Sequence, residues 1–256
     1  MEYYMGLDLG SSMSKGVIID SQSKVIAKHL VKTGYSFSEA GRTLKENLLR
    51  KANLKIEHIK NIVSSGYGRK NVEFANSFKT EIICHAKGAY YYFKKPGKII
   101  DIGGQDNKVI TIDETGSVLN FKMNRKCAAG TGAFIEETAN RLGIELNKLE
   151  DFANRATEDI TIASFCTVFA QTEIIRLIKE GQSVENISKG IFNSVCQRII
   201  EMDTFGDSII LTGGVIANFP IIKKLIENKT GCEVLIPENP QFCGAFGAAL
   251  IASGSF

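Results

Sequence analysis

The chain has 256 residues, 44% of them hydrophobic, so it can bury a core large enough for one large domain or two small ones. A net charge of +3 is too small to indicate binding to nucleic acid or to a membrane through bulk electrostatics. No charged segment followed by an apolar run opens the chain, so we expect no secretion signal and a cytoplasmic location. The uncharged stretch 239–256 is too short to span a bilayer and predicts a buried C-terminal helix.

The first predicted element is a β-hairpin. "YYMGLDLGSSMSKGVIID" (residues 3–20) has two apolar runs joined by small residues, which is typical of strand, turn and strand. Glycine and serine at a hairpin tip leave backbone N–H groups uncovered, and consecutive uncovered amides bind anions. Serine hydroxyls add donors, and a lysine adds a positive charge suited to a β- or γ-phosphate. The predicted phosphate-binding residues of this hairpin are Gly10, Ser11, Ser12, Met13, Ser14 and Lys15.

A second hairpin repeats the first, after a predicted helix (39–51), strand (59–64) and helix (81–93). "DIGGQDNKVITID" begins at Asp101 as "DLGSSMSKGVIID" begins at Asp8, and each carries a lysine seven residues later. We interpret the two as a pair of phosphate clamps, although two unrelated glycine-turn hairpins could match by chance. A carboxylate would repel phosphate, so Asp8 and Asp101 are expected to hold Mg²⁺ through its water shell. Gln105 could position an attacking water. The predicted phosphate contacts of the second hairpin are Gly103, Gly104 and Lys108.

Two cysteines stand beside predicted helix starts: Cys127 before "AAGTGAFIEETA" and Cys166 before "TVFAQTEII". A thiolate near a helix N-terminus has a lowered pKa, which suits it to metal ligation. Two thiolates cannot complete a four-iron cluster, but a twofold dimer supplies four. The spacing alone is no recognised ligand motif, and a structural role for both cysteines remains open. The Gly-Thr-Gly that follows Cys127 is expected to close over the phosphate side, through Gly130, Thr131 and Gly132.

The last motif is a double glycine. A long helix follows Ser183 and carries one apolar stripe, which predicts a core helix. "SIILTGGVIANFPIIKKLI" (208–226) then predicts a strand, two glycines and a helix. Adjacent glycines let a base or ribose approach the backbone, although a simple strand–helix turn would also use glycine. The predicted adenosine contacts are Gly213, Gly214, Asn218 and Gln241, the last two with a cap or turn role as the alternative.

Two phosphate hairpins followed by a double-glycine turn resemble the actin–Hsp70–sugar-kinase superfamily over the full chain. This resemblance implies an α/β fold of two duplicated lobes with ATP in the cleft between them. We place the N-terminal lobe at 1–95 and the C-terminal lobe at 96–256.

Six motifs narrow the family: "GLDLGSSMSK", "SSGYGR", "DIGGQDNKVI", "NRKCAAGTGAFIE", "SFCTVFAQTE" and "LTGGVIAN". Together they resemble the activator components of 2-hydroxyacyl-CoA dehydratases, in a group that includes benzoyl-CoA reductase ATPase subunits and reductases of double-cubane-cluster proteins. The resemblance implies a homodimer with ATP and Mg²⁺ in each cleft and one oxygen-sensitive [4Fe–4S] cluster held by Cys127 and Cys166 of both chains. It also implies a ferredoxin or flavodoxin donor and an iron–sulfur acceptor, either a dehydratase or a double-cubane-cluster protein. It gives no role to Tyr67 or Arg69.

Two other functions are compatible with parts of the pattern. A small-metabolite kinase of the same fold, similar to pantothenate kinase, would use Asp101 as a general base toward a substrate hydroxyl and would need no cysteine pair. A filament protein of the actin type is disfavoured, because the chain is short and lacks insertions for longitudinal contacts.

Overall fold

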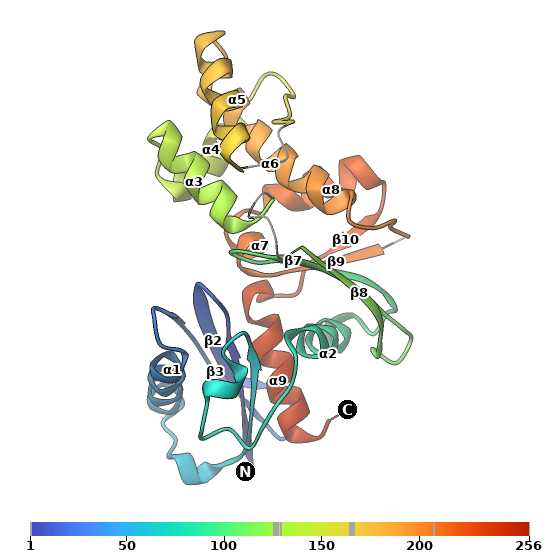
Figure 1. The fold of residues 1–256 in the computed structure, drawn as a ribbon. Helices are drawn as coiled ribbons and strands as arrows, with labels where there is room; N and C mark the ends of the chain where they lie inside the picture. Colours follow the sequence, from blue (N-terminus) through green and yellow to red (C-terminus); the bar gives the residue numbers. More distant parts are fainter. Residues whose placement is uncertain (1, 125–127, 129, 164–166, 207, 256) are drawn as a thin grey trace. The chain divides into compact units, whose positions relative to one another are not determined.

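The computed structural model describes residues 2–124, 128, 130–163, 167–206 and 208–255. Contacts divide the chain into two compact units, each with its own helices (Figure 1). Unit 1 comprises Met1–Ile99, Ile110–Phe121 and Pro237–Phe256, and unit 2 comprises Ile100–Val109 and Lys122–Ile236. The sequence predicts a C-terminal lobe that contains 110–121 and 237–256, whereas the contacts of these two segments group them with unit 1.

The first sheet has the strand order β3-β2-β1-β4-β5. The predicted hairpin consists of β1 (Tyr3–Leu9) and β2 (Met13–Asp20), and β3 (Val25–Lys32) extends it antiparallel to β2. On the other side, β4 (Ile59–Gly66) runs parallel to β1, and β5 (Ser77–Phe78) runs parallel to β4. The register places Asp8 opposite Lys15 on β2 and opposite Ser65 on β4.

Helices cover both faces of this sheet. α1 (Phe37–Ala52) packs on the face that carries Met5, Leu7 and Leu9, with Ser36 as its N-cap. The opposite face, which carries Tyr4 and Val17, packs against α9 (Cys243–Ser253). α2 (Glu81–Phe93) lies beside α9, and the short 3₁₀ segments of unit 1 are η1 (Ile56–His58), η2 (Arg69–Asn71) and η4 (Pro240–Phe242). The buried C-terminal helix predicted from the sequence is therefore confirmed.

Small residues bring α9 against its neighbours. A Cβ on Gly247 would lie 1.8 Å from the carbonyl oxygen of Cys84 on α2, and a Cβ on Gly6 of β1 would lie 2.0 Å from that of Ala245. Real Cβ atoms do not approach a carbonyl oxygen so closely, so both contacts require glycine. The close packing explains why the last segment of the chain belongs to unit 1 rather than to the lobe that precedes it in sequence.

The second sheet repeats the topology of the first, with the order β10-β9-β6-β7-β8. Its hairpin is β6 (Gly97–Ile102) and β7 (Asn107–Ile112), followed by β8 (Val118–Asn124). β9 (Ser208–Thr212) and β10 (Glu233–Leu235) pair in parallel. Each sheet thus has its first hairpin strand at the centre, and the shared topology agrees with the internal repeat in the sequence.

The helices of unit 2 share one apolar core with this sheet, built around Phe134, Phe192 and Ile209. They are α3 (Gly132–Leu142), η3 (Leu146–Lys148), α4 (Leu149–Asn154), α5 (Thr167–Lys179), α6 (Val184–Ile200), α7 (Gly214–Asn218) and α8 (Ile221–Thr230). α6 is the predicted long core helix and begins at the N-cap Ser183. In the part of the chain that the structure describes, no helix has the length and apolar character needed to cross a membrane.

Candidate functional site

The tip of the first hairpin is braced from β3. Thr33 donates a hydrogen bond from Oγ1 to the carbonyl oxygen of Gly10 (2.7 Å), and Oγ1 of Thr33 also lies 2.8 Å from Oγ of the buried Ser14. Because the single hydroxyl proton of Thr33 goes to Gly10, Ser14 is the donor of the second bond. The Ser14 hydroxyl therefore shapes the tip, whereas Ser12 is exposed there and Ser11 is partly exposed. Thr33 lies outside the hairpin motif and is not predicted from it.

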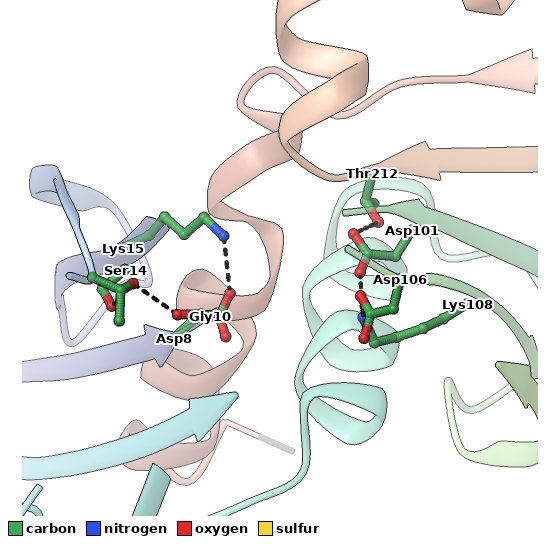
Figure 2. A network of polar contacts seen from close by, with 9 residues as sticks. Asp8, Gly10, Ser14, Lys15, Asp101, Asp106, Lys108 and Thr212 are labelled. Atoms are coloured by element: carbon green, nitrogen blue, oxygen red, sulfur yellow. Dashed lines mark hydrogen bonds and ion pairs between the residues drawn. The ribbon is translucent and has the colours of Figure 1, made fainter. Parts of the chain in front are cut away.

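The carboxylate of Asp8 is buried at the end of β1. Its Oδ2 lies 3.7 Å from Nζ of Lys15, whose side chain is 18% exposed (Figure 2). Its Oδ1 faces Gly66 at the end of β4, where a Cβ would approach within 2.6 Å. Gly66 has a φ of +84°, in the left-handed region that favours glycine. Asp8 is thus held between a positive charge and a glycine turn.

The second hairpin holds its lysine more tightly. Nζ of Lys108 lies 3.1 Å from Oδ2 of Asp101 and 2.8 Å from Oδ1 of Asp106, and the side chain of Lys108 is only 6% exposed (Figure 2). Burial acts to lower the pKa of Lys108, but the two carboxylates outweigh it and the pKa is raised. Lys108 therefore remains charged and in contact with two carboxylates. Lys15 contacts one carboxylate, at a longer distance.

Asp106 is a site residue that the repeat does not predict. It is buried, and its Oδ2 has no hydrogen-bond partner among the described residues. The corresponding position in the first hairpin, five residues after the strand-end aspartate, is Met13. A signal was available: Asp106 stands two residues before Lys108, the spacing that places side chains on one face of a strand.

The predicted Gly-Thr-Gly segment is bonded to the tip of the second hairpin. The N–H of Gly132 donates to the carbonyl oxygen of Gly103 (2.9 Å), and the N–H of Ala133 donates to that of Gly104 (2.7 Å). The buried Asn107 donates from Nδ2 to the carbonyl oxygen of Gly130 (2.7 Å). Three bonds thus join the tip to the start of α3. Gly104 and Gln105 remain exposed at the tip.

Thr131 is the N-cap residue of α3, but its buried hydroxyl donates to the carbonyl oxygen of Ala128 (2.6 Å). The hydroxyl of Thr131 is therefore used for a hydrogen bond within the loop. The contacts of this segment with the hairpin tip are made by its backbone.

The double glycine follows β9 as predicted. Gly213 has a φ of +105°, and a Cβ there would lie 2.7 Å from Oδ1 of Asp101. Oγ1 of Thr212 lies 3.5 Å from the same oxygen. The exposed Asn218 donates from Nδ2 to the carbonyl oxygen of Gly214 (2.7 Å), which corresponds to the helix-turn role considered for it. The fourth predicted adenosine contact, Gln241, lies in η4 of unit 1.

The "SSGYGR" loop is the unit 1 counterpart of this turn. Gly66 contacts Asp8 and the carbonyl oxygen of Leu9, as Gly213 contacts Asp101 and that of Ile102. Arg69 braces the loop, because its Nη1 donates to the carbonyl oxygen of Gly66 (2.9 Å). In both units, a glycine turn thus packs against the strand-end aspartate. The sequence alone predicts no role for the "SSGYGR" loop.

Carboxylate oxygens are the kind of ligand that Mg²⁺ prefers, and Asp8 in unit 1 and Asp101 and Asp106 in unit 2 supply them at strand ends. Cys127 and Cys166 lie outside the described residues. The other four cysteines, Cys84, Cys196, Cys232 and Cys243, are buried. Burial raises the pKa of Cys84 and of Cys196 to about 12. Within the described ranges, no group of three or more His, Cys, Asp or Glu side chains could hold a metal ion.

Comparison with known proteins gives one family. The model of the BadF/BadG/BcrA/BcrD ATPase family matches residues 5–252. The 2-hydroxyisocaproyl-CoA dehydratase activator of Clostridioides difficile is 38% identical over 253 residues, which cover 98% of this chain and 94% of the relative. The structure of that activator with bound ADPNP has a TM-score of 0.91 at 36% identity, covering 99% of this chain and 95% of the other.

Two further structures share the fold. Component A of (R)-2-hydroxyglutaryl-CoA dehydratase from Acidaminococcus fermentans has a TM-score of 0.94 at 36% identity, covering 100% of this chain and 99% of the other. A ROK family glucokinase from Streptomyces griseus, solved with glucose and AMPPNP, has a TM-score of 0.59 at 12% identity, covering 98% and 99%. The last likeness concerns the fold alone. These structures confirm the predicted α/β fold of the sugar-kinase type.

Proposed function

The chain belongs to the BadF/BadG/BcrA/BcrD ATPase family, and we propose that it is an ATP-dependent activator that delivers single electrons to an iron–sulfur partner. The observation that carries the proposal is the duplicated strand-end aspartate. Each aspartate is held by a lysine seven residues later and by a positive-φ glycine at the end of another strand or directly after it. Such a frame suits a magnesium nucleotide, and a relative with the same fold has been solved with ADPNP.

The contacts suggest separate roles for the two lysines. Among the described residues, Lys15 has a single carboxylate neighbour, and it is partly exposed, so we assign it to the β- and γ-phosphates, together with the backbone of Gly10, Ser11 and Ser12. Lys108 is engaged with Asp101 and Asp106, so we assign it to holding these carboxylates rather than to phosphate.

The second hairpin would also contribute to phosphate binding. Gly103 and Gly104 offer backbone amides, and the exposed Gln105 is suited to orient the attacking water. Asp8 and Asp101 would hold Mg²⁺ through its water shell, and the ion would neutralise charge on the phosphates. Gly213 and Gly214 leave the backbone uncovered for the adenosine.

The bonds at the start of α3 support a mechanical role for ATP. A displacement of the hairpin tip would pass directly to Gly130, Gly132 and Ala133, because all three are bonded to the hairpin. Cys127 immediately precedes this segment in sequence. Rigid elements that move together can convert events at one site into a change at another. We therefore propose that nucleotide turnover would displace the start of α3 and, with it, the segment of the sequence that carries Cys127.

We propose Cys127 and Cys166 of two chains as the ligands of one [4Fe–4S] cluster in a homodimer, which would supply the single-electron chemistry. For one electron, a tenfold gain in the equilibrium constant of electron transfer corresponds to about 59 mV, or about 1.4 kcal/mol. Several such gains would therefore require only a few kcal/mol from ATP. The names of the relatives favour a 2-hydroxyacyl-CoA dehydratase as the acceptor, with a double-cubane-cluster protein as the other choice. A ferredoxin or flavodoxin would supply the electron in an anaerobic cytoplasm.

Anaerobic purification tests the proposal. We expect a brown dimer with about four irons per two chains, and ATP hydrolysis that accelerates electron transfer to a dehydratase. Cys127→Ala should remove the colour and leave nucleotide binding nearly intact, whereas Cys232→Ala, at a buried cysteine outside the proposed ligand pair, should keep its iron. A Cys127→Ala variant that retains its iron refutes the ligand assignment.

The rival kinase makes the opposite predictions. It would be colourless and would phosphorylate a small alcohol with Asp101 as the general base. The contact between Asp101 and Lys108 disfavours that role, because the ammonium group stabilises the deprotonated carboxylate and weakens it as a proton acceptor.

A further inference from the structure

A buried histidine lies near the carboxylate of Asp8. His85 lies on α2 and is 5% exposed. A Cβ placed on Gly244, in the first turn of α9, would lie 2.8 Å from Nε2 of His85 and 3.2 Å from Oδ2 of Asp8. The imidazole nitrogen and the carboxylate oxygen therefore border the same small space, which is open because residue 244 has no side chain.

The backbone around His85 is fixed by the crossing of α2 and α9. A Cβ on Gly88 would lie 2.3 Å from the carbonyl oxygen of Cys243, and one on Gly247 would lie 1.8 Å from that of Cys84. The thiol of Cys243 also contacts the carbonyl oxygen of His85, with a sulfur–oxygen distance of 3.7 Å. Two helices in direct backbone contact thus fix the position of His85 near Asp8.

The two aspartates of the repeat differ in their additional neighbour. In unit 2, the lysine beside Asp101 is shared with a second carboxylate, Asp106. In unit 1, Met13 stands at the corresponding position and offers no charge, and His85 borders the same space as the aspartate. In unit 2, the second carboxylate holds Lys108 in place. In unit 1, a hydrogen-bond donor to Asp8 would make this carboxylate less dependent on Lys15.

We propose that His85 is a positioning residue of the nucleotide site, which supports Asp8 so that Lys15 can turn to phosphate. Without such support, movement of Lys15 toward a phosphate would leave the Asp8 carboxylate buried and uncompensated, which is unfavourable. A hydrogen bond from Nε2–H of His85 to Oδ2, formed as the ammonium group leaves, would give the carboxylate a new donor. The inference rests on the nucleotide binding of the proposed function, but not on the cluster or the electron acceptor.

Binding of MgADPNP to the full-length protein tests the inference. A hydrogen bond to a charged group makes a difference of about tenfold or more in affinity, so His85→Ala should weaken binding by about that factor. His85→Gln, which restores an N–H donor, should recover most of the affinity. His29→Ala is the matched control, since His29 lies on β3 of the same unit and should leave binding unchanged. Melting followed by circular dichroism verifies that each variant is folded.

Two double variants separate positioning from a general structural effect. In a Lys15→Met background, His85→Ala should weaken binding no further, because the lysine that it releases is absent. Gly244→Ala should resemble His85→Ala, since its methyl group would occupy the shared space, and the two changes together should be no worse than either alone.

The outcomes are distinct. Wild-type affinity in His85→Ala, failure of His85→Gln to recover binding, or additive losses in either double variant overturns the inference. A wild-type protein that binds MgADPNP but contains no iron and transfers no electron refutes the proposed function and leaves the inference standing.

Discussion

Replacement of Lys108 by methionine should destabilise unit 2 strongly. The side chain is buried between the carboxylates of Asp101 and Asp106, at 3.1 and 2.8 Å from Nζ. Methionine nearly preserves the apolar volume but removes the charge, and it leaves two buried carboxylates facing one another. Removing one partner of a buried ion pair costs about 3–5 kcal/mol. We expect a loss of about that size and a melting temperature lower by about 10 °C or more.

The pH dependence identifies the cause. The pKa of Lys108 is raised in the folded state, so its contribution is complete below the unfolded pKa and is lost only as pH rises through the folded pKa, which lies above 10.5. The wild-type protein should therefore show no effect of Lys108 titration from about pH 6 to 9. In Lys108→Met, repulsion and burial favour protonated carboxylates, so the penalty should shrink as pH falls from about 8 to 5.5.

Urea unfolding without nucleotide, followed by far-ultraviolet circular dichroism, measures both effects. Lys15→Met is the matched control: its contact with Asp8 is 3.7 Å long and partly exposed, so the expected loss is about 1 kcal/mol or less. Asp106→Asn combined with Lys108→Met should recover part of the stability, because one unpaired charge disappears. A loss below about 1 kcal/mol for Lys108→Met, or one that is equal at both pH values, contradicts this reasoning.

Three other outcomes follow from the packing and the caps. Gly247→Ala should cost about 3 kcal/mol or more in urea unfolding, because the methyl group would overlap the carbonyl oxygen of Cys84, 1.8 Å away; a neutral substitution contradicts the close crossing. Ser183→Ala should cost about 1 kcal/mol, because it removes the cap that accepts from the N–H of Asn186; Ser183→Thr should retain most of it. The thiols of Cys84 and Cys196, with a pKa of about 12, should resist a disulfide reagent at about pH 8 until the protein unfolds, and fast labelling of either in the folded state refutes their burial.

Local patterns in the sequence account for most of the elements. The helix predicted at 81–93 is α2, and the strand predicted at 59–64 is β4, which extends to Gly66. The helix predicted at 39–51 begins two residues earlier and ends one later, because Ser36 accepts a hydrogen bond from the N–H of Glu39 and Asn53 ends the helix in the left-handed conformation. Caps, turns and apolar periodicity act over a few residues, and they can be read without knowledge of the tertiary structure.

Contacts between distant segments cannot be predicted from such local patterns. Nothing near Cys243 in the sequence predicts that its helix packs against β1 and α2, more than 150 residues earlier, because that contact depends on the complementary shapes of two glycine-containing helices. His85 was missed for the same reason. It lies in an unremarkable apolar helix, and only the packing of α9 brings Asp8 into its neighbourhood.

The two lysines of the repeat differ in their contacts, which the repeat alone does not predict. Because "DLGSSMSK" and "DIGGQDNK" align, symmetry predicts the same task for both lysines. The position five residues after each aspartate separates them: Asp106 holds Lys108, whereas Met13 leaves Lys15 with a single, looser carboxylate contact. A duplicated frame can therefore provide one lysine fixed among carboxylates and one able to meet a phosphate. If Met13→Asp were to hold Lys15 as Asp106 holds Lys108, MgADPNP binding should weaken while thermal stability is kept, and unchanged binding would show that the second carboxylate does not decide the role of the lysine.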